Sequence, residues 1–484
     1  MAKTRQNSEM EAQPVAAYGL DGGMFRNVGS ARIPENGCYD TENAIFYDGR
    51  VRPRPPFVQS IAYSAGTTQQ CNHLGIWRQP GQEYLIRHEF TPGGPSQKIY
   101  YWDGAWNDLT VAGPILGSAT QPPYSTQFKG EWIVCPGAAA VSSWTGSGQV
   151  VTLASRQSDA ALDPPVDPYY ITSTASRVFL ANGIVGGIRI PYRVWWSDTL
   201  SSIIWSDGSG QPAAGSAGYQ DIAHDSSAIT GLTFQGGVDV ICFKEWSVYR
   251  GVFKGGPVWY DFVPISMNHG CPAGRTIKTF RNTLFWLGND YNVYAMPLRG
   301  AVTPVGDAIR SRIKATLAFS YRNMALASVD HELGLYYLII PTGSGGPDKI
   351  FVLNLQTGAW AEGLVAGSLK IHSTFEIMPA YSLGQQLFGG SDGKIYYFTP
   401  TYTRLADAQT DAVGAGGTAY SAKIWGKTLD FLELFKQQGE TAEFHCLGLQ
   451  GESGKATPQC RIGESIKELL AASSLTYDEV NLDS

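Results

Sequence analysis

The sequence predicts an all-β fold made of many short strands, and three observations lead to this prediction. The 484 residues include 56 glycines, aromatic residues make up 12% of the chain, and only 16% of the residues are charged. Glycine supplies the positive φ angles that tight hairpins demand. Long-helix and coiled-coil proteins need far more Ala, Glu, Lys and Leu, and a hydrophobic content of 43% excludes wholesale disorder. Besides these three features of the composition, a repeating unit of strand-like runs supports the same prediction.

Seven such units follow one another between about residues 60 and 400, and they average about 49 residues each. This spacing lies in the range of four-stranded β-propeller blades, so we predict a β-propeller of about seven blades. Six or eight blades also fit, and two β-sandwiches would produce similar strand spacing. The strands predicted for the seven units are, in order, 73–78, 83–89 and 98–103; 125–128, 131–135 and 150–153; 177–180, 193–197 and 202–205; 229–234, 238–243, 247–253 and 259–264; 276–280, 283–287, 293–297 and 302–305; 324–329, 334–340, 349–355 and 359–362; and 372–377, 386–389 and 394–398.

The segments outside the repeat differ from it in composition. We expect residues 1–15 to form a flexible arm and residues 16–60, which are rich in Gly, Asn, Asp and Pro, to form an extended segment that closes the propeller or docks on it. After the propeller at 61–400, residues 418–434 and 441–449 alternate in period two, so residues 401–450 are predicted to form an additional small β element. Residues 451–484 form a C-terminal tail with a short amphipathic helix at 464–472.

One helix interrupts the strand pattern, and basic residues accompany it. Asp307 is expected to cap a short helix through Ile309 and Ile313. Its exposed sides carry three basic residues, Arg310, Arg312 and Lys314.

A second basic group, Arg50, Arg52 and Arg54, is spaced two residues apart on one face of an extended segment. These three arginines pair with acidic groups of this or a neighbouring subunit, or they contact another partner or DNA phosphate. Together with Arg310 and Arg312 they are our candidate subunit or partner contacts.

Charge, cysteine content and hydropathy set further bounds. The net charge of −6 gives no basic excess for tight nucleic-acid binding. Seven cysteines without a C-x-x-C pair indicate reduced, mostly buried thiols. The polar N-terminal residues predict no signal peptide, and without a run of about 18 apolar residues we expect no membrane insertion.

The search for catalytic chemistry turns up weak candidates. Residues 389–393 match G-x-S-x-G, but the nucleophile elbow requires a helix next, whereas a strand-like run follows; a hairpin turn is predicted instead. A glycosidase needs two facing carboxylates, and the candidates Asp198, Asp207 and Glu245 cannot be paired from the sequence. Trp195 and Trp196 (with Trp205) could stack on a sugar, although blade aromatics usually belong to the core.

Metal and nucleotide motifs are no stronger. The seven histidines are scattered, and the only close pairs, His269 with Cys271 and His445 with Cys446, fall short of four ligands. The sequence has neither a Walker loop nor a G-x-G-x-x-G fingerprint. We therefore predict no catalytic residue, cofactor or metal, and expect that the protein is not an enzyme.

A resemblance to a known family rests on the N-terminal segment. The residues that carry it are 19–23 (GLDGG), 33–36 (IPEN), 42–43 (EN) and 48–53 (DGRVRP). This pattern resembles the opening of β-propeller tail hub or nozzle proteins of tailed bacteriophages, of the tail tubular or packaged-DNA-stabilisation type. The chain reads RPP at 54–56, where a glycine is usual, and 419–449 also looks like the post-propeller strands of that group.

The resemblance implies a structural virion protein located in the tail and assembled in the host cytoplasm. Such proteins form a ring, usually a homo-hexamer, below the head-to-tail adaptor or portal. They extend the DNA channel, retain the packaged genome and support fibres, a spike or a needle, while DNA passes without sequence-specific binding. A slightly acidic chain suits a channel wall, because a basic wall would bind passing DNA. The alternative is a propeller glycosidase or carbohydrate-binding module.

Overall fold

The computed structural model describes residues 22–398, apart from 30–31, 35, 48–49, 61–68, 92–96, 111–120, 138, 157, 206–215, 238, 256–258, 366–368 and 378–384. Beyond residue 398 it describes the backbone of five short strands: β34 (Gln409–Asp411), β35 (Thr418–Tyr420), β36 (Lys423–Trp425), β37 (Gln459–Cys460) and β38 (Asp478–Glu479). The arm predicted at 1–15, the helix predicted at 464–472 and most of the element predicted at 401–450 lie outside the described residues.

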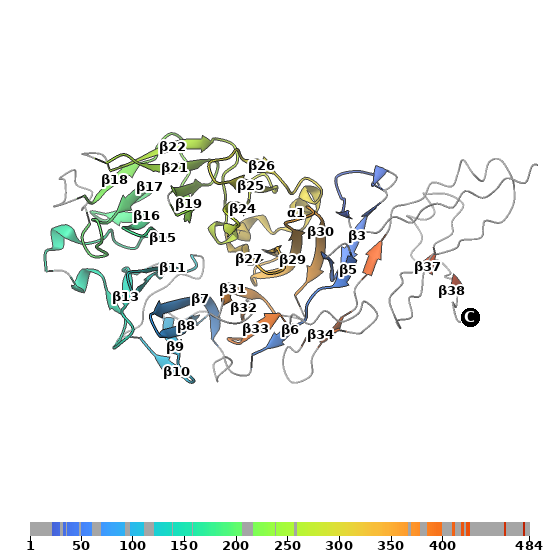
Figure 1. Ribbon diagram of the computed structural model, residues 1–484, viewed down its shortest axis with the longest axis horizontal. Helices are drawn as coiled ribbons and strands as arrows, with labels where there is room; N and C mark the ends of the chain where they lie inside the picture. Colours follow the sequence, from blue (N-terminus) through green and yellow to red (C-terminus); the bar gives the residue numbers. More distant parts are fainter. Residues whose placement is uncertain are drawn as a thin grey trace, which may run out of the picture.

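Seven four-stranded antiparallel sheets form the body of the molecule, which confirms the predicted seven-bladed β-propeller (Figure 1). The first strands of neighbouring blades contact one another and form the inner ring. Blades one to three comprise β7 (Gln70–Gln79), β8 (Gln82–Phe90), β9 (Gln97–Trp102) and β10 (Trp106–Asp108); β11 (Tyr124–Phe128), β12 (Glu131–Cys135), β13 (Ser142–Trp144) and β14 (Val151–Thr152); and β15 (Tyr170–Ser173), β16 (Val178–Val185), β17 (Ile188–Trp196) and β18 (Gly218–Asp221).

The remaining four blades continue in chain order, with one exception at the end. Blades four to six comprise β19 (Ile229–Gln235), β20 (Asp239–Lys244), β21 (Val248–Phe253) and β22 (Tyr260–Ser266); β23 (Lys278–Phe280), β24 (Thr283–Leu287), β25 (Val293–Pro297) and β26 (Thr303–Pro304); and β27 (Leu326–Asp330), β28 (Leu335–Pro341), β29 (Pro347–Asn354) and β30 (Trp360–Leu364). Blade seven combines β31 (Ile371–Ile377), β32 (Gln385–Gly390) and β33 (Ile395–Phe398) with β6 (Phe57–Gln59) from the N-terminal segment.

Strand β6 closes the ring by pairing antiparallel with β33, so that Phe398 lies opposite Phe57. Phe57 is completely buried, and its ring lies 5.1 Å from that of Phe388 and 4.7 Å from that of Phe398. A strand from the start of the chain thus completes the last blade and joins the two ends of the propeller.

Local sequence explains several turns and also the places where the predicted strands were wrong. Arg281 and Asn282 both have positive φ, as a two-residue type I′ hairpin between β23 and β24 requires. Residues 202–205, predicted as a strand, form none; Trp205 is instead buried, and its indole donates to Ser202 O at 2.8 Å. The predicted strand at 276–280 is split into a 3₁₀ turn, η4 (Gly274–Thr276), and β23.

The N-terminal segment adds five further short strands beside the ring. They are β1 (Gly23–Met24), β2 (Gly37–Cys38), β3 (Asp40–Glu42), β4 (Ala44–Tyr47) and β5 (Arg50–Pro53). Strands β3 to β5 lie next to β30 of blade six, at the end of the molecule away from blades two and three (Figure 1). Strand β3 also pairs antiparallel with β36, which brings together two segments that flank the propeller in the sequence.

The hydrophobic core lies between adjacent blades, and its largest cluster extends into the N-terminal segment. Met24, Cys38 and Phe46 of that segment pack with residues of blades five and six and of helix α1 (Arg310–Thr316). The other short helices are 3₁₀ turns: η2 (Ala154–Arg156), η3 (Ala160–Leu162) and η5 (Phe319–Met324).

Helix α1 occurs where a helix was predicted, but its predicted cap was wrong. Ile309 occupies the N-cap position, where no side-chain hydrogen bond caps the described helix. Asp307 lies two residues earlier and accepts a hydrogen bond from the Asn292 side chain at 2.7 Å. Ile313 is buried on the inner side of the helix, as its spacing from Ile309 predicts.

Candidate functional site

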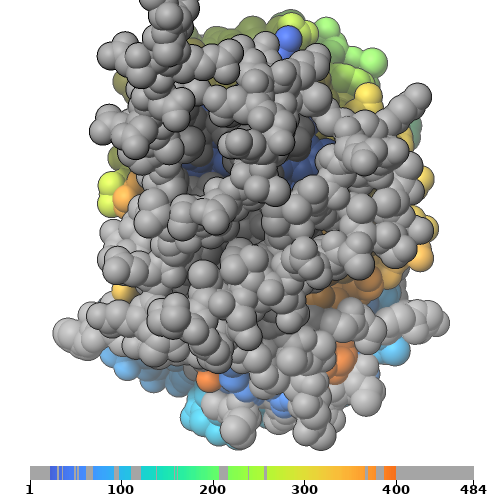
Figure 2. Space-filling model, turned by 90° about the vertical axis from the view of Figure 1, so that its right-hand side faces the viewer, coloured from blue at the N-terminus to red at the C-terminus, as the bar shows by residue number. Residues whose placement is uncertain are grey.

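The elements that carry four of the five candidate contact arginines lie on one side of the molecule. The fifth, Arg54, comes directly after the strand that holds Arg50 and Arg52. We define the blade-six flank as strands β1–β5, the edge strand β30 and helix α1. Arg50 and Arg52 belong to β5, and Arg310 and Arg312 belong to α1. In Figure 2, residues of the N-terminal segment (blue) and of the later blades (orange) are visible on this side.

Side chains of the N-terminal segment satisfy the outer edge of β30. The backbone amide of Glu362 donates to Thr41 Oγ1 at 2.8 Å, and that of Leu364 donates to Asn43 Oδ1 at 3.0 Å. Residues two apart in a strand point their amides to the same side, so these two bonds occupy successive edge positions. The segment therefore covers an edge that would otherwise present unpaired amides.

Asn43 and Arg54 form the next layer of this attachment. Asn43 has a φ of 55°, a left-handed conformation that asparagine tolerates better than most residues. Its Oδ1 also accepts from Arg54 Nε at 3.1 Å, while Arg54 NH1 donates to the carbonyl of Pro55 at 3.0 Å. Arg54 is only 3% exposed within the chain, and these two bonds give it a role in holding the segment in place.

Gly23 shows how closely the segment approaches blade six. Its φ of 88° favours glycine, and a Cβ there would lie 2.7 Å from the backbone nitrogen of Trp360 and 2.8 Å from Ala359 Cα. The preceding Gly22 donates from its amide to the carbonyl of Asn36 at 2.9 Å. Any side chain at position 23 would push the segment away from the blade.

A buried carboxylate links the flank to helix α1. Arg312 donates from Nε and NH2 to the two carboxylate oxygens of Glu362, both at 2.7 Å, and Lys349 forms a second ion pair with Glu362. Burial by itself would raise the pKa of Glu362, but the hydrogen bonds from Arg312 and Lys349 outweigh it and hold that pKa below its ordinary value. Arg312 is thus engaged within the subunit.

A third ion pair, between Arg26 and Asp40, lies beside the two pairs of Glu362. Burial raises the pKa of Asp40, Arg26 opposes this shift, and the Glu362 carboxylate adds to it. Arg26 also stacks over the Tyr39 ring at 4.2 Å, and its backbone is bonded to α1 through Ser311, whose hydroxyl donates to Arg26 O at 2.8 Å.

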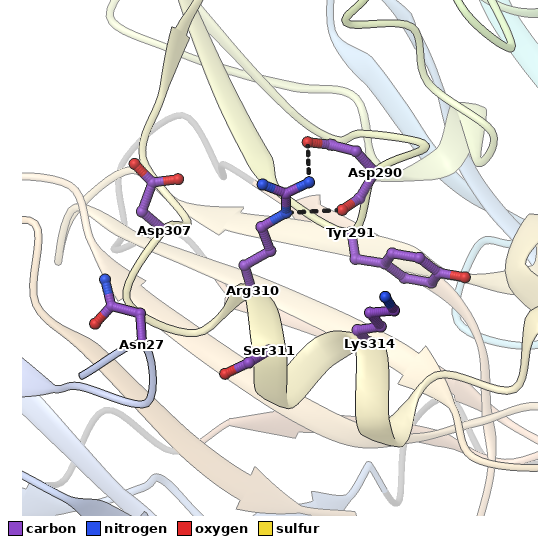
Figure 3. Close-up of a pocket in the computed structure, with 7 residues that line it drawn as sticks. All are labelled: Asn27, Asp290, Tyr291, Asp307, Arg310, Ser311 and Lys314. Carbon is purple, nitrogen blue, oxygen red and sulfur yellow. Dashed lines mark hydrogen bonds and ion pairs between the residues drawn. The ribbon is translucent and has the colours of Figure 1, made fainter. Parts of the chain in front are cut away.

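A surface hollow of about 620 Å³ lies where the N-terminal segment meets α1 (Figure 3). Its polar lining consists of Asn27, Asp290, Tyr291, Asp307, Arg310, Ser311 and Lys314. Arg310 crosses it and donates from Nε to the backbone carbonyl of Asp290 at 3.0 Å, and its NH2 lies 3.1 Å from the Asp290 carboxylate. Half of the Arg310 side chain remains exposed, so this arginine is accessible to a partner.

The carboxylates considered for glycoside hydrolysis have separate structural roles. Asp198 Oδ1 accepts from the Ser216 amide at 2.8 Å and hydroxyl at 2.6 Å, whereas Glu245 pairs with Arg322. Asp207 lies outside the described residues. The G-x-S-x-G string spans the turn between β32 and β33, as predicted, and Tyr396 donates to the Asp392 carboxylate in that turn at 2.6 Å.

The other chemical candidates also have structural roles. Trp195, Trp196 and Trp205 are buried core residues, and His269 Nδ1 lies 2.8 Å from the Ser266 hydroxyl. Within the described ranges, no group of three or more His, Cys, Asp or Glu residues could hold a metal ion. His445 and Cys446 lie outside those ranges. None of the helices that the structure describes is long and apolar enough to cross a bilayer.

One surface feature has no counterpart in the sequence predictions. Trp246, Met267 and Phe319 are each between 44% and 56% exposed, although they come from blade four and from η5. Arg322 connects the segments of Trp246 and Phe319, because its guanidinium lies 4.1 Å from the Phe319 ring centroid and pairs with Glu245, the neighbour of Trp246. Because the two segments are more than 70 residues apart, no local sequence pattern could reveal this surface.

No protein-family model matches the chain, and no curated protein matches it. Among solved structures, the computationally designed Ika8 protein matches with a TM-score of 0.39 and 11% identity over 71% of this chain and 100% of its own. The Pan2 WD40 domain of Neurospora crassa matches with a TM-score of 0.40 and 9% identity over 72% and 97%. The extracellular domain of a hybrid two-component system from B. thetaiotaomicron matches with a TM-score of 0.46 and 9% identity over 74% and 40%.

Proposed function

We propose that this chain is a structural subunit of a bacteriophage tail and not an enzyme. It would form a ring, as a homo-hexamer, below the head-to-tail adaptor or portal, where it extends the DNA channel, retains packaged DNA and supports fibres, a spike or a needle. The ring would assemble in the host cytoplasm and remain in the virion tail, and genomic DNA would pass without sequence-specific binding.

The observation that carries this proposal is the structural use of the residues that resemble phage tail propeller proteins. Gly22, Gly23, Asn36 and Asn43 fasten the N-terminal segment to blade six and to itself. The residues of the resemblance thus belong to an ordered flank beside the propeller ring. Such a flank offers a surface on which neighbouring subunits of a tail can pack. The exposed surface around Trp246 and Phe319 supplies further apolar area for such contacts.

The decisive experiment measures assembly of the purified full chain by sedimentation and electron microscopy, alone and with purified adaptor rings. We expect the chain to form rings on the adaptor. Arg310→Ala removes a half-exposed contact candidate on the flank and should weaken association about tenfold or more. Lys254→Ala, at a similarly exposed site on blade four, is the matched control and should assemble like the wild type.

Two outcomes would overturn the proposal. One is a chain that stays monomeric and does not bind adaptor rings at concentrations where tail proteins assemble. The other is release of sugars from host polysaccharide, which would favour the glycosidase alternative.

A further inference from the structure

The 3₁₀ turn η4 lies on the propeller axis. A Cβ on Gly274 would meet Tyr124 Oη at 2.9 Å and Thr230 O at 2.1 Å, and Tyr124 belongs to blade two whereas η4 leads into blade five. Because blades two and five are not neighbours, their residues can meet only across the centre of the ring. Glycine at position 274 is what permits this close approach.

Arg275 extends from this turn across the axis. One of its terminal nitrogens donates to Met324 O at 3.0 Å, just before blade six, and the other donates to His372 O in blade seven. Its Nε is buried and has no hydrogen-bond partner in the described part of the chain. Burial also lowers the pKa of Arg275 to about 10, which shows how unfavourable this position is for a positive charge.

Lys278, the first residue of β23, brings a second positive charge to the same place. Burial and the neighbouring Arg275 charge lower the pKa of Lys278 to about 8. No hydrogen bond or ion pair joins Lys278 to any residue that the structure describes. The Glu376 carboxylate, whose charge raises the pKa of Lys278, is already paired with His331.

The opposite wall is neutral. His73 of blade one lies 2.7 Å from the Ser125 hydroxyl through Nε2. Burial, together with the charges of His88, Arg275 and Lys278, lowers the pKa of His73 to about 3, so the imidazole carries no charge at neutral pH. His73, Ser125 and Lys278 all belong to inner strands and yet remain partly exposed, which means that solvent reaches the axis.

The axis therefore has two cations with free donor groups, and none of the carboxylates that the structure describes forms an ion pair with either of them. Buried charges in folded proteins are normally paired, because an isolated charge in a low-dielectric interior is costly. We propose that Lys278 and Arg275 form a binding site for a small inorganic anion, of the size of chloride or phosphate, on the propeller axis. This site is independent of the proposed tail function, since it belongs to the interior of a single propeller.

The test compares melting temperatures of the full chain at constant ionic strength, with gluconate as the bulky reference anion and chloride or phosphate as the probes. The melting temperature of the wild type should rise by roughly 2–5 °C with at least one probe, and the rise should saturate as the probe concentration increases. Lys278→Met should melt higher than the wild type in gluconate, because it removes one of two neighbouring positive charges that are only partly exposed, and should lose the response to both probes.

Lys244→Met is the matched control. Lys244 is also buried, but it is bonded to Ile222 O at 2.8 Å and to Asp225 O at 2.9 Å, and it pairs with the Asp225 carboxylate. This variant should be destabilised in every salt and keep the full response to the probes. The proposal is overturned if neither probe stabilises the wild type more than gluconate does, or if Lys278→Met responds as the wild type does.

Discussion

Glu362 illustrates how one side chain can join separate parts of this molecule. Its carboxylate is bonded to Arg312 of α1 and to Lys349 of β29, and its backbone amide is bonded to Thr41 of the N-terminal segment. The carboxylate is almost fully buried, so water cannot replace it as a partner for the two cations. Its loss would leave buried positive charge, which costs more than losing an exposed pair.

We therefore expect Glu362→Gln to lower the free energy of unfolding by about 3 kcal/mol. Urea denaturation of the variant and the wild type measures this difference. Glu83→Gln is the control, because the Arg78–Glu83 pair is about 40% exposed and should contribute less than about 1 kcal/mol. Equal losses in the two variants would contradict the assignment.

The ion pair between His331 and Glu376 can be tested by pH titration. The hydrogen bond that His331 Nδ1 donates to the Glu376 carboxylate raises the pKa of His331 above its ordinary value, and burial opposes this only in part. The stability gained from this pair is thus fully present below about pH 6.5, the unfolded value, and is lost as the pH rises through the folded pKa. NMR titration should give His331 a pKa above about 6.5 in the wild type and a lower pKa in the Glu376→Gln variant.

The same titration contains its own reference. Burial lowers the pKa values of His73 and His372 to about 3, so neither ring should titrate in the range where His331 does. If His331 titrates normally in the wild type, or if Glu376→Gln leaves its pKa unchanged, the assigned pair does not form in solution.

Among the structural elements, the short strand β6 has a large effect on the fold, because it closes the propeller ring. Three residues from the N-terminal segment supply the fourth strand of blade seven and so connect the start of the propeller to its end. Strands β1–β5, which precede β6 in the same segment, form the flank beside blade six. Docking of the flank and closure of the ring therefore use one continuous stretch of chain.

Phe57→Ala should therefore lower the free energy of unfolding by about 3–5 kcal/mol, since it leaves a cavity between Phe388 and Phe398. Thermal or urea unfolding followed by tryptophan fluorescence measures the loss. Phe253→Ala is the control at a site that is 57% exposed, and it should cost less than about 1 kcal/mol. A small loss for Phe57→Ala would mean that β6 does not hold blade seven together.

For the whole molecule, the described cysteines report on the integrity of the fold. Cys38, Cys71, Cys135, Cys242 and Cys271 are all buried free thiols, in agreement with the prediction from their spacing. Burial raises the pKa of Cys71 to about 11 and that of Cys38 to about 12, so little reactive thiolate forms at neutral pH.

These five thiols should resist a thiol reagent in the native protein and become reactive together during unfolding, because ring closure couples the blades. Mass spectrometry after labelling at increasing denaturant concentration identifies which cysteines react. Rapid labelling of any of the five under native conditions would show that its blade opens independently.

Local pattern predicted much of the fold, and its failures have physical causes. Blade four was predicted strand by strand because its long apolar runs and clear turns carry the signal locally. The short strands β10, β13, β15 and β18 were missed, since a strand of three or four residues has too few positions to show a period. Asp307 follows the rule for a helix cap, but Asn292 in the preceding hairpin binds its carboxylate instead.

The sequence alone determined the all-β class, the seven-unit repeat and the buried state of the described cysteines, because glycine turns, alternation and apolar content act between residues close in the chain. Only the tertiary structure decided that Arg54 is buried, that Glu362 joins helix α1 to the N-terminal segment and that Arg275 and Lys278 meet at the axis. The bonds from Glu362 to Thr41 and from Arg275 to His372 join residues that are remote in sequence, and folding of the ring is what brings those partners together.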